Sequence, residues 1–209
     1  MSRPAGFASL CLVSNGVVLT TTNGSALADF DHLATDQDAW NMTTHGLNSV
    51  SPDERWLGMF RSFSPYLYIY RLPGFERVAK LTNEARISLF EFSPRGDEVA
   101  VSSRGGVEFW STTTWQRTCH LTNFTGILYS PDAHTAWLYT KFRAAGLHDA
   151  RTLEPLLPLP KGALPLAISP DGRRLAVSVD GRHMQVWDLV EVRNQLRAIG
   201  LDWHHERPK

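Results

Sequence analysis

The sequence predicts an all-β fold, in which about five repeated units of short antiparallel strands precede one short helix near the end of the chain. In the clearest unit, two turns separate three short apolar runs, which lie at 166–168, 175–178 and 184–187. The turns read Ser169-Pro170-Asp171-Gly172 and Asp180-Gly181. Pro and Gly preset the dihedrals of such turns, and Asp caps them through its side chain. Apolar runs joined in this way are typical of antiparallel strands in a meander.

A serine at the start of the first turn recurs along the chain. The copies are Ser14, Ser51, Ser93, Ser130 and Ser169, so the successive steps are 37, 42, 37 and 39 residues. A period of about 40 residues with several short strands per unit is the sequence signature of β-propeller blades. The sequence therefore predicts a β-propeller of four-stranded blades.

The units differ in completeness. Their predicted boundaries, within a single domain that spans 1–209, are about 8–46, 47–86, 87–125, 126–162 and 163–188. The third unit is the most complete, with strand-like runs at 88–92, 99–103, 107–110 and 116–121. The second has runs at 56–60, 66–70 and 77–81, and the fourth at 127–129, 136–139, 146–149 and 153–157. The first is weaker, with runs at 10–14, 17–22 and 26–31 before a polar segment at 33–40, and the fifth lacks a fourth strand.

A helix is predicted at 189–200. Asp188 stands at the N-cap with Glu191 three residues later, which is a capping-box arrangement. Gly200 suits the left-handed position that ends many helices. We expect this helix to pack on the last unit and to cover a sheet edge that would otherwise recruit another strand.

The turn at 169–172 and the run Val186-Trp187-Asp188 resemble the WD-repeat (WD40) β-propeller family. The resemblance extends over about 8–203, and the closing segment is similar to the C-terminus of bacterial, planctomycete-type WD-repeat proteins. Some of those proteins carry an upstream kinase domain, but this sequence has no kinase signature. Family propellers usually have seven blades, so about five units imply a small or incomplete propeller, or the C-terminal part of a larger one.

The sequence departs from the family pattern in two ways. The Trp-Asp dipeptide occurs only in the last unit, and the equivalent pairs are Phe30-Asp31, Tyr70-Arg71, Trp110-Ser111 and His148-Asp149. The Gly-His pair that opens many family repeats is absent throughout. The hydrogen-bond network that the family builds on these residues is therefore not implied here.

Composition excludes several classes of partner. Formal net charge is zero, so no whole-molecule field favours nucleic acid or an anionic membrane, and we expect neither as a partner. Cys11 and Cys119 are too few for a disulfide framework, which indicates a reducing, cytoplasmic compartment. No apolar run approaches the roughly 18 residues of a membrane span. Oligomeric state is left open.

No residue set indicates an enzyme, a metal site or a cofactor. None of the eight histidines occurs in a spacing that would place ligands around a metal. Cys119 precedes His120, but adjacent strand residues point to opposite faces, so a nucleophile and its base are not predicted there. Arg104-Gly105-Gly106 has the pattern of a hairpin turn and not of a phosphate-binding loop.

One pattern points to a binding surface. In propellers of the resembled family, the loop between the second and third strands opens on the same face in every blade. The candidate binding residues in these loops are Arg61, Phe63, Arg104, Lys141, Arg143, Arg182 and His183. Clustered Arg side chains suit carboxylates or phosphates, because the planar guanidinium donates two parallel hydrogen bonds. Solvated loops also carry charge for no further reason, and both interpretations stay open.

The sequence thus favours a non-catalytic scaffold that binds another protein or peptide, with an acidic segment as one candidate for capture by the basic loops. Two alternatives are a detached C-terminal part of a larger, kinase-linked sensor and a propeller-type hydrolase. Fold alone does not decide between them.

Overall fold

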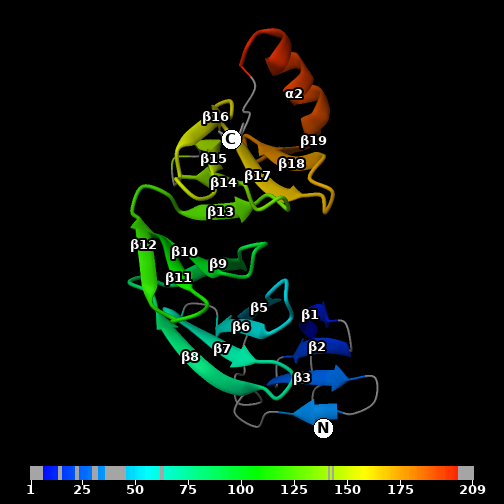
Figure 1. Cartoon of the computed structure of the whole chain (residues 1–209), viewed down its shortest axis with the longest axis vertical. Helices are drawn as coiled ribbons and strands as arrows, with labels where there is room; N and C mark the ends of the chain where they lie inside the picture. The colour runs from blue at the N-terminus through cyan, green and yellow to red at the C-terminus, as the bar shows by residue number, and fades with distance from the viewer. Residues whose placement is uncertain are drawn as a thin grey trace, which may run out of the picture. The chain divides into compact units, whose positions relative to one another are not determined.

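The computed structural model describes residues 7–13, 16–21, 24–29, 33–35, 46–61, 64–140, 142 and 144–201. The described residues form nineteen strands and one α-helix, and the strands pair into five antiparallel sheets in chain order (Figure 1). Each sheet is a meander, because every strand pairs with the next one in sequence. The chain divides into two compact units, Met1–Thr122 and Asn123–Lys209. A single domain over 1–209 stays a prediction.

The first unit contains three four-stranded sheets. The first sheet consists of β1 (Phe7–Val13), β2 (Gly16–Thr21), β3 (Gly24–Asp29) and β4 (Leu33–Thr35). The second consists of β5 (Gly46–Val50), β6 (Trp56–Arg61), β7 (Tyr66–Arg71) and β8 (Glu76–Thr82). The third consists of β9 (Ile87–Phe92), β10 (Glu98–Ser103), β11 (Gly106–Ser111) and β12 (Arg117–Leu121).

The second unit contains one four-stranded sheet, one three-stranded sheet and the helix. The fourth sheet consists of β13 (Gly126–Tyr129), β14 (Thr135–Tyr139), β15 (Ala145–Asp149) and β16 (Pro155–Pro158). The fifth consists of β17 (Ala163–Ile168), β18 (Arg174–Val179) and β19 (His183–Asp188). Helix α2 (Leu189–Ala198) follows β19 directly.

The predicted all-β fold of four-stranded sheets with a short C-terminal helix is therefore confirmed. The predicted start of one strand was wrong. A strand was expected at 153–157, but β16 begins only at Pro155. The preceding residues form a turn in which Leu153 has a φ of 62° and donates its N–H to the Asp149 carbonyl at 3.0 Å. In the polar segment 33–40, only Leu33–Thr35 is described, and it pairs with β3.

The repeated serine turns share one backbone geometry. The N–H of the serine donates to the carbonyl five residues later at 2.9 Å, in the turns that begin at Ser51, Ser93, Ser130 and Ser169. The third residue after each serine has a positive φ, and these residues are Glu54 (55°), Gly96 (72°), Ala133 (58°) and Gly172 (68°). Ser14 lies outside the described residues. The turn thus demands a left-handed residue at one position, which the chain fills with Gly only twice.

Replacing Ala133 by Gly is therefore expected to stabilise the protein by about 0.5–1 kcal/mol, because a Cβ in the left-handed region is strained. The free energy of unfolding in urea measures this effect. Ala136→Gly is the matched control. Ala136 is fully buried in β14, so glycine at this position should destabilise the protein. Equal destabilisation by both changes would contradict the explanation.

Apolar packing between successive sheets forms the core of the first unit. The first strands lie next to one another, with β1 beside β5 and β5 beside β9. Phe60 and Phe90 meet edge to face at 5.9 Å between the second and third sheets. A Cβ on Gly58 would collide with the Phe90 ring, so glycine leaves the space that this ring fills.

The second unit packs its two sheets in the same way. Its core contains Trp137 and Leu147 of the fourth sheet and Leu175 and Val177 of the fifth, together with Leu189 from the helix. All five side chains are buried, and β13 lies beside β17. One face of the fifth sheet is thereby covered by the fourth sheet.

The helix begins and ends at the predicted cap residues, but the Glu191 side chain accepts Gln195 Nε2 at 2.9 Å and does not complete the predicted capping box. The Asp188 carboxylate accepts the N–H groups of Val190 and Glu191, at 2.9 and 3.2 Å. At the other end of the helix, Gly200 has a φ of 76°. The Leu201 N–H donates to the Leu196 carbonyl at 2.9 Å, and this hydrogen bond completes a Schellman motif. The expectation that the helix covers a sheet edge was wrong for the described residues. Leu189 is its one buried residue, and five of the six residues of β19 are exposed.

Candidate functional site

The candidate binding residues that the structure describes lie in, or directly beside, the connections between second and third strands. Arg104 is in the β10–β11 turn, Arg182 and His183 are at the β18–β19 turn, and Arg61 ends β6. The side chains of Arg104, Arg182 and His183 are exposed. Phe63, Lys141 and Arg143 lie outside the described residues. Because Arg104 and Arg182 belong to different compact units, a shared basic face stays a prediction.

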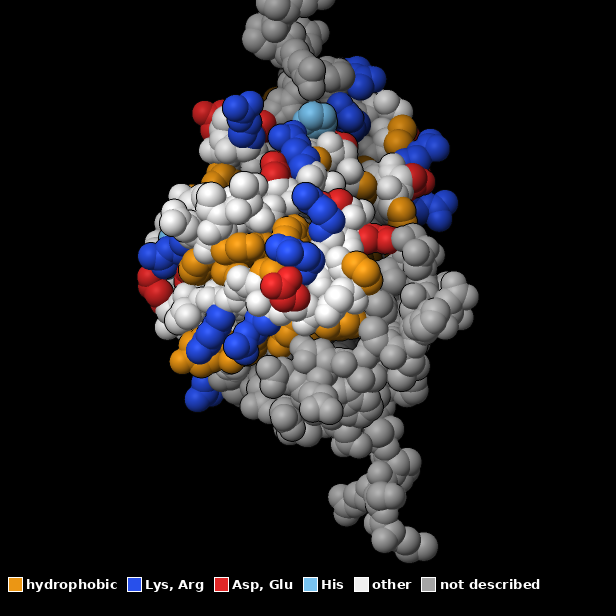
Figure 2. All heavy atoms as spheres, turned by 60° about the horizontal axis from the view of Figure 1, so that its bottom comes forward, with side chains coloured by type: hydrophobic (Ala, Val, Ile, Leu, Met, Phe, Trp, Pro, Cys, Tyr) orange, Lys and Arg blue, Asp and Glu red, His pale blue; other side chains and the backbone are white. Residues whose placement is uncertain are grey.

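The β10–β11 turn, which carries Arg104, and the β18–β19 turn, which carries Arg182, each have a defined backbone geometry. Around Arg104, the Ser103 hydroxyl accepts the Gly105 N–H at 3.0 Å and donates to the Gly106 carbonyl at 3.2 Å. Beside Arg182, Asp180 and Gly181 both have positive φ, at 53° and 67°, as two-residue hairpin turns require. On the face drawn in Figure 2, Lys and Arg side chains stand singly or in small groups among the acidic and apolar side chains of the described residues.

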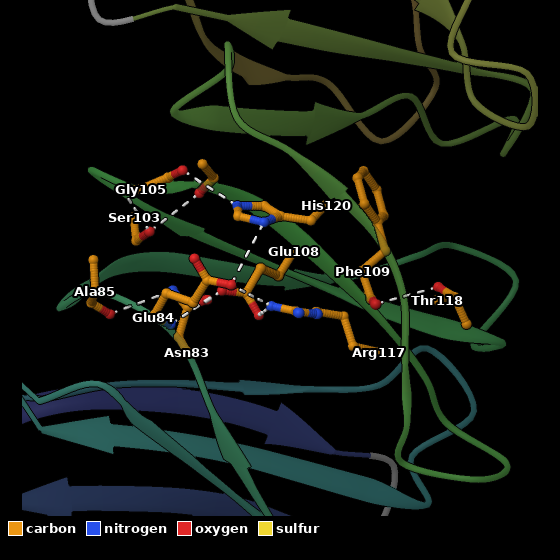
Figure 3. Close-up of polar contacts among 11 residues, drawn as sticks. Asn83, Glu84, Ala85, Ser103, Gly105, Glu108, Phe109, Arg117, Thr118 and His120 are labelled. Carbon is orange, nitrogen blue, oxygen red and sulfur yellow. Dashed lines mark hydrogen bonds and ion pairs between the residues drawn. The ribbon is translucent and has the colours of Figure 1, made fainter.

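A buried carboxylate that the sequence did not indicate forms the centre of a polar cluster in the third sheet (Figure 3). Only 1% of Glu108 is exposed. Its Oε1 accepts the backbone N–H of Glu84 at 3.1 Å, and its Oε2 accepts Arg117 Nη1 at 3.3 Å. When the amide nitrogen of Asn83 faces this carboxylate, it donates to Oε1 and, at 3.0 Å, to Oε2.

The outer part of this cluster is charged and open to solvent. Arg117 Nη1 also donates to Glu84 Oε1 at 2.9 Å, and His120 Nδ1 lies 3.8 Å from the same oxygen. The hydrogen bond from Arg117 lowers the pKa of Glu84 below its ordinary value of 4.5. Hydrogen bonds to Glu84 and then to Glu108 raise the pKa of Arg117 above its ordinary value.

The cluster joins the β8–β9 turn to β11 and β12. The Glu108 carboxylate is held by the Glu84 N–H, by Arg117 and, in the orientation described above, by the amide of Asn83. Glu108 and its partner Glu84 are 24 residues apart. Contacts between residues this far apart in the chain produce no recognisable sequence motif. The cluster was therefore not predicted from motifs.

A cavity of about 440 Å³ lies within the second unit, between the serine turns of the fourth and fifth sheets and the first turns of α2. Trp137, Leu147 and Leu189 contribute apolar surface to it. The carboxylates at its rim are engaged in their own turns. Asp132 accepts two backbone N–H groups, and the Ser169 hydroxyl and then the Arg173 N–H lower the pKa of Asp171. Arg173 and Arg193 also line the cavity, so its surface is both apolar and polar.

The structure offers little support for metal or nucleophile chemistry in the part of the chain that it describes. No three His, Cys, Asp or Glu side chains there are grouped so that they could hold a metal ion. His148 Nδ1 is 3.1 Å from the Leu153 carbonyl, and its ring packs edge to face on Phe124 at 5.3 Å. Nor does that part contain a helix long and apolar enough to cross a membrane.

No protein-family model matches the sequence, and no curated protein does. Among solved structures, the chain is similar to the β-propeller domain of Myceliophteria thermophila Cps50 (Swd1), with a TM-score of 0.69 and 14% identity over 90% of this chain and 66% of that one. It is also similar to Kuenenia stuttgartiensis hydrazine synthase, with a TM-score of 0.63 and 13% identity over 85% of this chain and 56% of that one.

These similarities define the fold class. The four-stranded meander sheets have the architecture of a β-propeller, as predicted from the repeat. The chain spans just under two thirds of the first of these structures and a little over half of the second. At such low identity the likeness concerns the fold alone.

Proposed function

We propose that this chain is a non-catalytic, WD-repeat-like scaffold that binds an acidic segment of another protein through the loops between second and third strands. The proposal is carried by a difference between a buried, paired carboxylate and exposed arginines. Buried Glu108 is neutralised within the protein, whereas Arg104 and Arg182 stand exposed on ordered turns and form no ion pair among the described residues. Exposed guanidinium groups on a rigid backbone are well suited to pair with carboxylates.

The propeller fold supports this role, since its loops form broad surfaces that suit partners. Zero net charge favours a protein over a nucleic acid as the partner, and the low cysteine count favours the cytoplasm. A bacterial origin belongs to the same proposal and is supported by the resemblance of the closing segment. The hydrolase and the detached sensor fragment stay predictions.

The test is a charge reversal in the predicted loops. The variant Arg61→Glu, Arg104→Glu, Arg143→Glu is titrated against a fluorescent poly-glutamate peptide at low and high salt. We expect its affinity to fall by more than about tenfold, and that of the unchanged protein to weaken as salt rises.

A matched variant carries the same change of charge at the opposite ends of the strands. Arg95→Glu, Arg151→Glu, Arg173→Glu alters exposed arginines in turns between first and second or third and fourth strands. We expect this variant to lose little affinity. If both variants bind poly-glutamate equally, or if the unchanged protein does not bind it, the basic loops are not the binding surface.

A further inference from the structure

The serine turns of the second and fourth sheets differ in the residue that follows them. Trp56 begins β6 and Thr135 begins β14, and each is the fifth residue after the serine of its turn. Both side chains lie on the strand face that packs on the next sheet, since residues two positions apart share a face. On that face, a Cβ on Gly58 would meet the Phe90 ring of the third sheet, and Trp137 packs on the fifth sheet. A large ring in one sheet thus corresponds to a small side chain in the other.

In the first unit, an aromatic pair fills the space at this position. The Trp56 and Trp115 rings meet edge to face with 5.1 Å between their centroids, and both pack against the core that the second and third sheets share. Trp115 belongs to the turn between β11 and β12. The guanidinium carbons of Arg55 and Arg71 each lie 5.8 Å from the centre of the Trp56 ring. An indole therefore occupies this position beside positive charge.

In the second unit, the corresponding position is open. Thr135 lines the cavity of about 440 Å³, together with the buried apolar side chains of Trp137 and Leu189. This volume falls within the roughly 300–1,000 Å³ that is typical of ligand pockets. Because α2 follows β19 directly, the fifth sheet has no counterpart, among its described residues, of the turn that carries Trp115. The cavity therefore offers apolar walls where the first unit holds an aromatic pair.

A buried hydroxyl without a hydrogen bond lines the same cavity. In three other serine turns, the hydroxyl donates to an aspartate of its own turn, as Ser51 does to Asp53 at 2.6 Å. In the fourth sheet, Asp132 accepts two backbone N–H groups instead. The Ser130 hydroxyl has no hydrogen-bond partner among the described residues, although only 6% of Ser130 is exposed. A buried hydroxyl in this state favours a ligand that carries a hydrogen-bonding group.

Arg173 supplies positive charge at the edge of the cavity. Its side chain lines the cavity, belongs to an exposed residue and forms no ion pair among the described residues. The neighbouring carboxylates of Asp132 and Asp171 accept hydrogen bonds within their own turns. A guanidinium can donate two parallel hydrogen bonds to a carboxylate. The cavity thus combines apolar walls with two donors for an anionic group.

We propose that this cavity binds a small aromatic carboxylate. The ring of the ligand lies against Trp137 and Leu189, as the paired rings pack in the first unit. Its carboxylate accepts hydrogen bonds from the Ser130 hydroxyl and the Arg173 guanidinium. All of these residues belong to the second unit. The site is separate from the basic loops and goes beyond the proposed scaffold function, because it adds a small-molecule ligand.

The test uses indole-3-acetate as the probe, and isothermal titration calorimetry with the full chain measures its affinity. We expect saturable binding of one molecule per chain. Indole, which lacks the carboxylate, should bind more weakly, and acetate, which lacks the ring, should not bind.

Two variants examine the carboxylate contact. Arg173→Gln should weaken the binding of indole-3-acetate by more than about fivefold, because charge-assisted hydrogen bonds are lost. Arg174→Gln is the matched control, since Arg174 is an exposed neighbour that does not line the cavity, and its affinity should be unchanged.

A third variant fills the cavity. Thr135→Trp introduces an indole at the position that Trp56 has in β6, and we expect it to abolish binding of the probe. Thermal melting verifies that all three variants fold, and Arg173→Gln tests the site even if Thr135→Trp does not.

Several outcomes overturn the proposal. They are an absence of saturable binding by indole-3-acetate, equal affinity for indole, equal weakening by Arg173→Gln and Arg174→Gln, and unchanged binding by a folded Thr135→Trp. The loop variant with three glutamates should bind indole-3-acetate normally. Its binding to poly-glutamate is measured separately, so this proposal and the basic-loop function can fail independently.

Discussion

Replacing Trp137 by alanine is expected to reduce the free energy of unfolding by about 3–5 kcal/mol, the largest loss for a single core residue of the second unit. Trp137 is 1% exposed and packs against Leu147, Leu175 and Leu189, so truncation leaves a cavity that rigid neighbours cannot fill. Urea denaturation measures the loss, and hydrogen exchange should show reduced protection in β14, β15 and β18.

The variant Trp137→Phe distinguishes the contribution of aromatic packing to stability from that of the indole Nε1. The buried Nε1 of Trp137 has no hydrogen-bond partner among the described residues, so phenylalanine removes an unsatisfied donor together with some volume. We expect a loss of only about 1 kcal/mol. Trp187→Ala should also be milder than Trp137→Ala, because Trp187 is only half-buried. If Trp187→Ala destabilises the protein more, the core is not centred on Trp137.

Replacing Glu108 by leucine is the second large expected effect, at about 2–4 kcal/mol of lost stability. The change removes the acceptor of three donors and leaves the amide of Asn83, which is 4% exposed, without its buried partner. Arg117→Met should be less destabilising, because Glu108 then keeps its hydrogen bonds to Asn83 and Glu84. Denaturant unfolding of both single variants and of the double variant gives the coupling between the two residues.

A surface pair and a pH series provide the controls for this cluster. Arg71→Met breaks a pair with Glu76 whose side chains are 58% and 69% exposed, so its effect should be close to zero. Arg117 lowers the pKa of Glu84, so the stability that their pair contributes is present above pH 4.5 and is lost as pH falls through the folded-state pKa. The difference between the protein and Arg117→Met should therefore shrink in acid. A difference that grows below pH 4.5 would contradict the ion pair.

The sequence predicted most strands because their signals are local. The serine turns at 51, 93, 130 and 169 combine Pro with residues that cap turns or tolerate a left-handed backbone, and the structure gives all four the same hydrogen bonds. The same reasoning located the helix, since Asp188 and Gly200 act within one turn of its ends. The sequence-based prediction failed before β16. Leu153 adopts a positive φ there, although leucine is not a residue type that indicates a turn.

The candidate site was predictable only in part. Arg104 and Arg182 lie on exposed turns between second and third strands, and the exposed His183 begins β19. Whether these residues form one surface depends on the arrangement of sheets that lie far apart in the chain. The exposure of Val186 on β19 was not predicted, because the sequence suggested that the helix would cover this edge.

By itself, the sequence determined the repeat, the turns and the all-β class of this protein, because Pro, Gly and Asp restrict the backbone within a few residues and alternation marks the strands. Only the tertiary structure decided that Glu108 is buried among donors from Asn83, Glu84 and Arg117, and that β19 pairs with β18 alone among the described strands. Burial and pairing depend on partners that are distant in the chain, so no local pattern of residues encodes them.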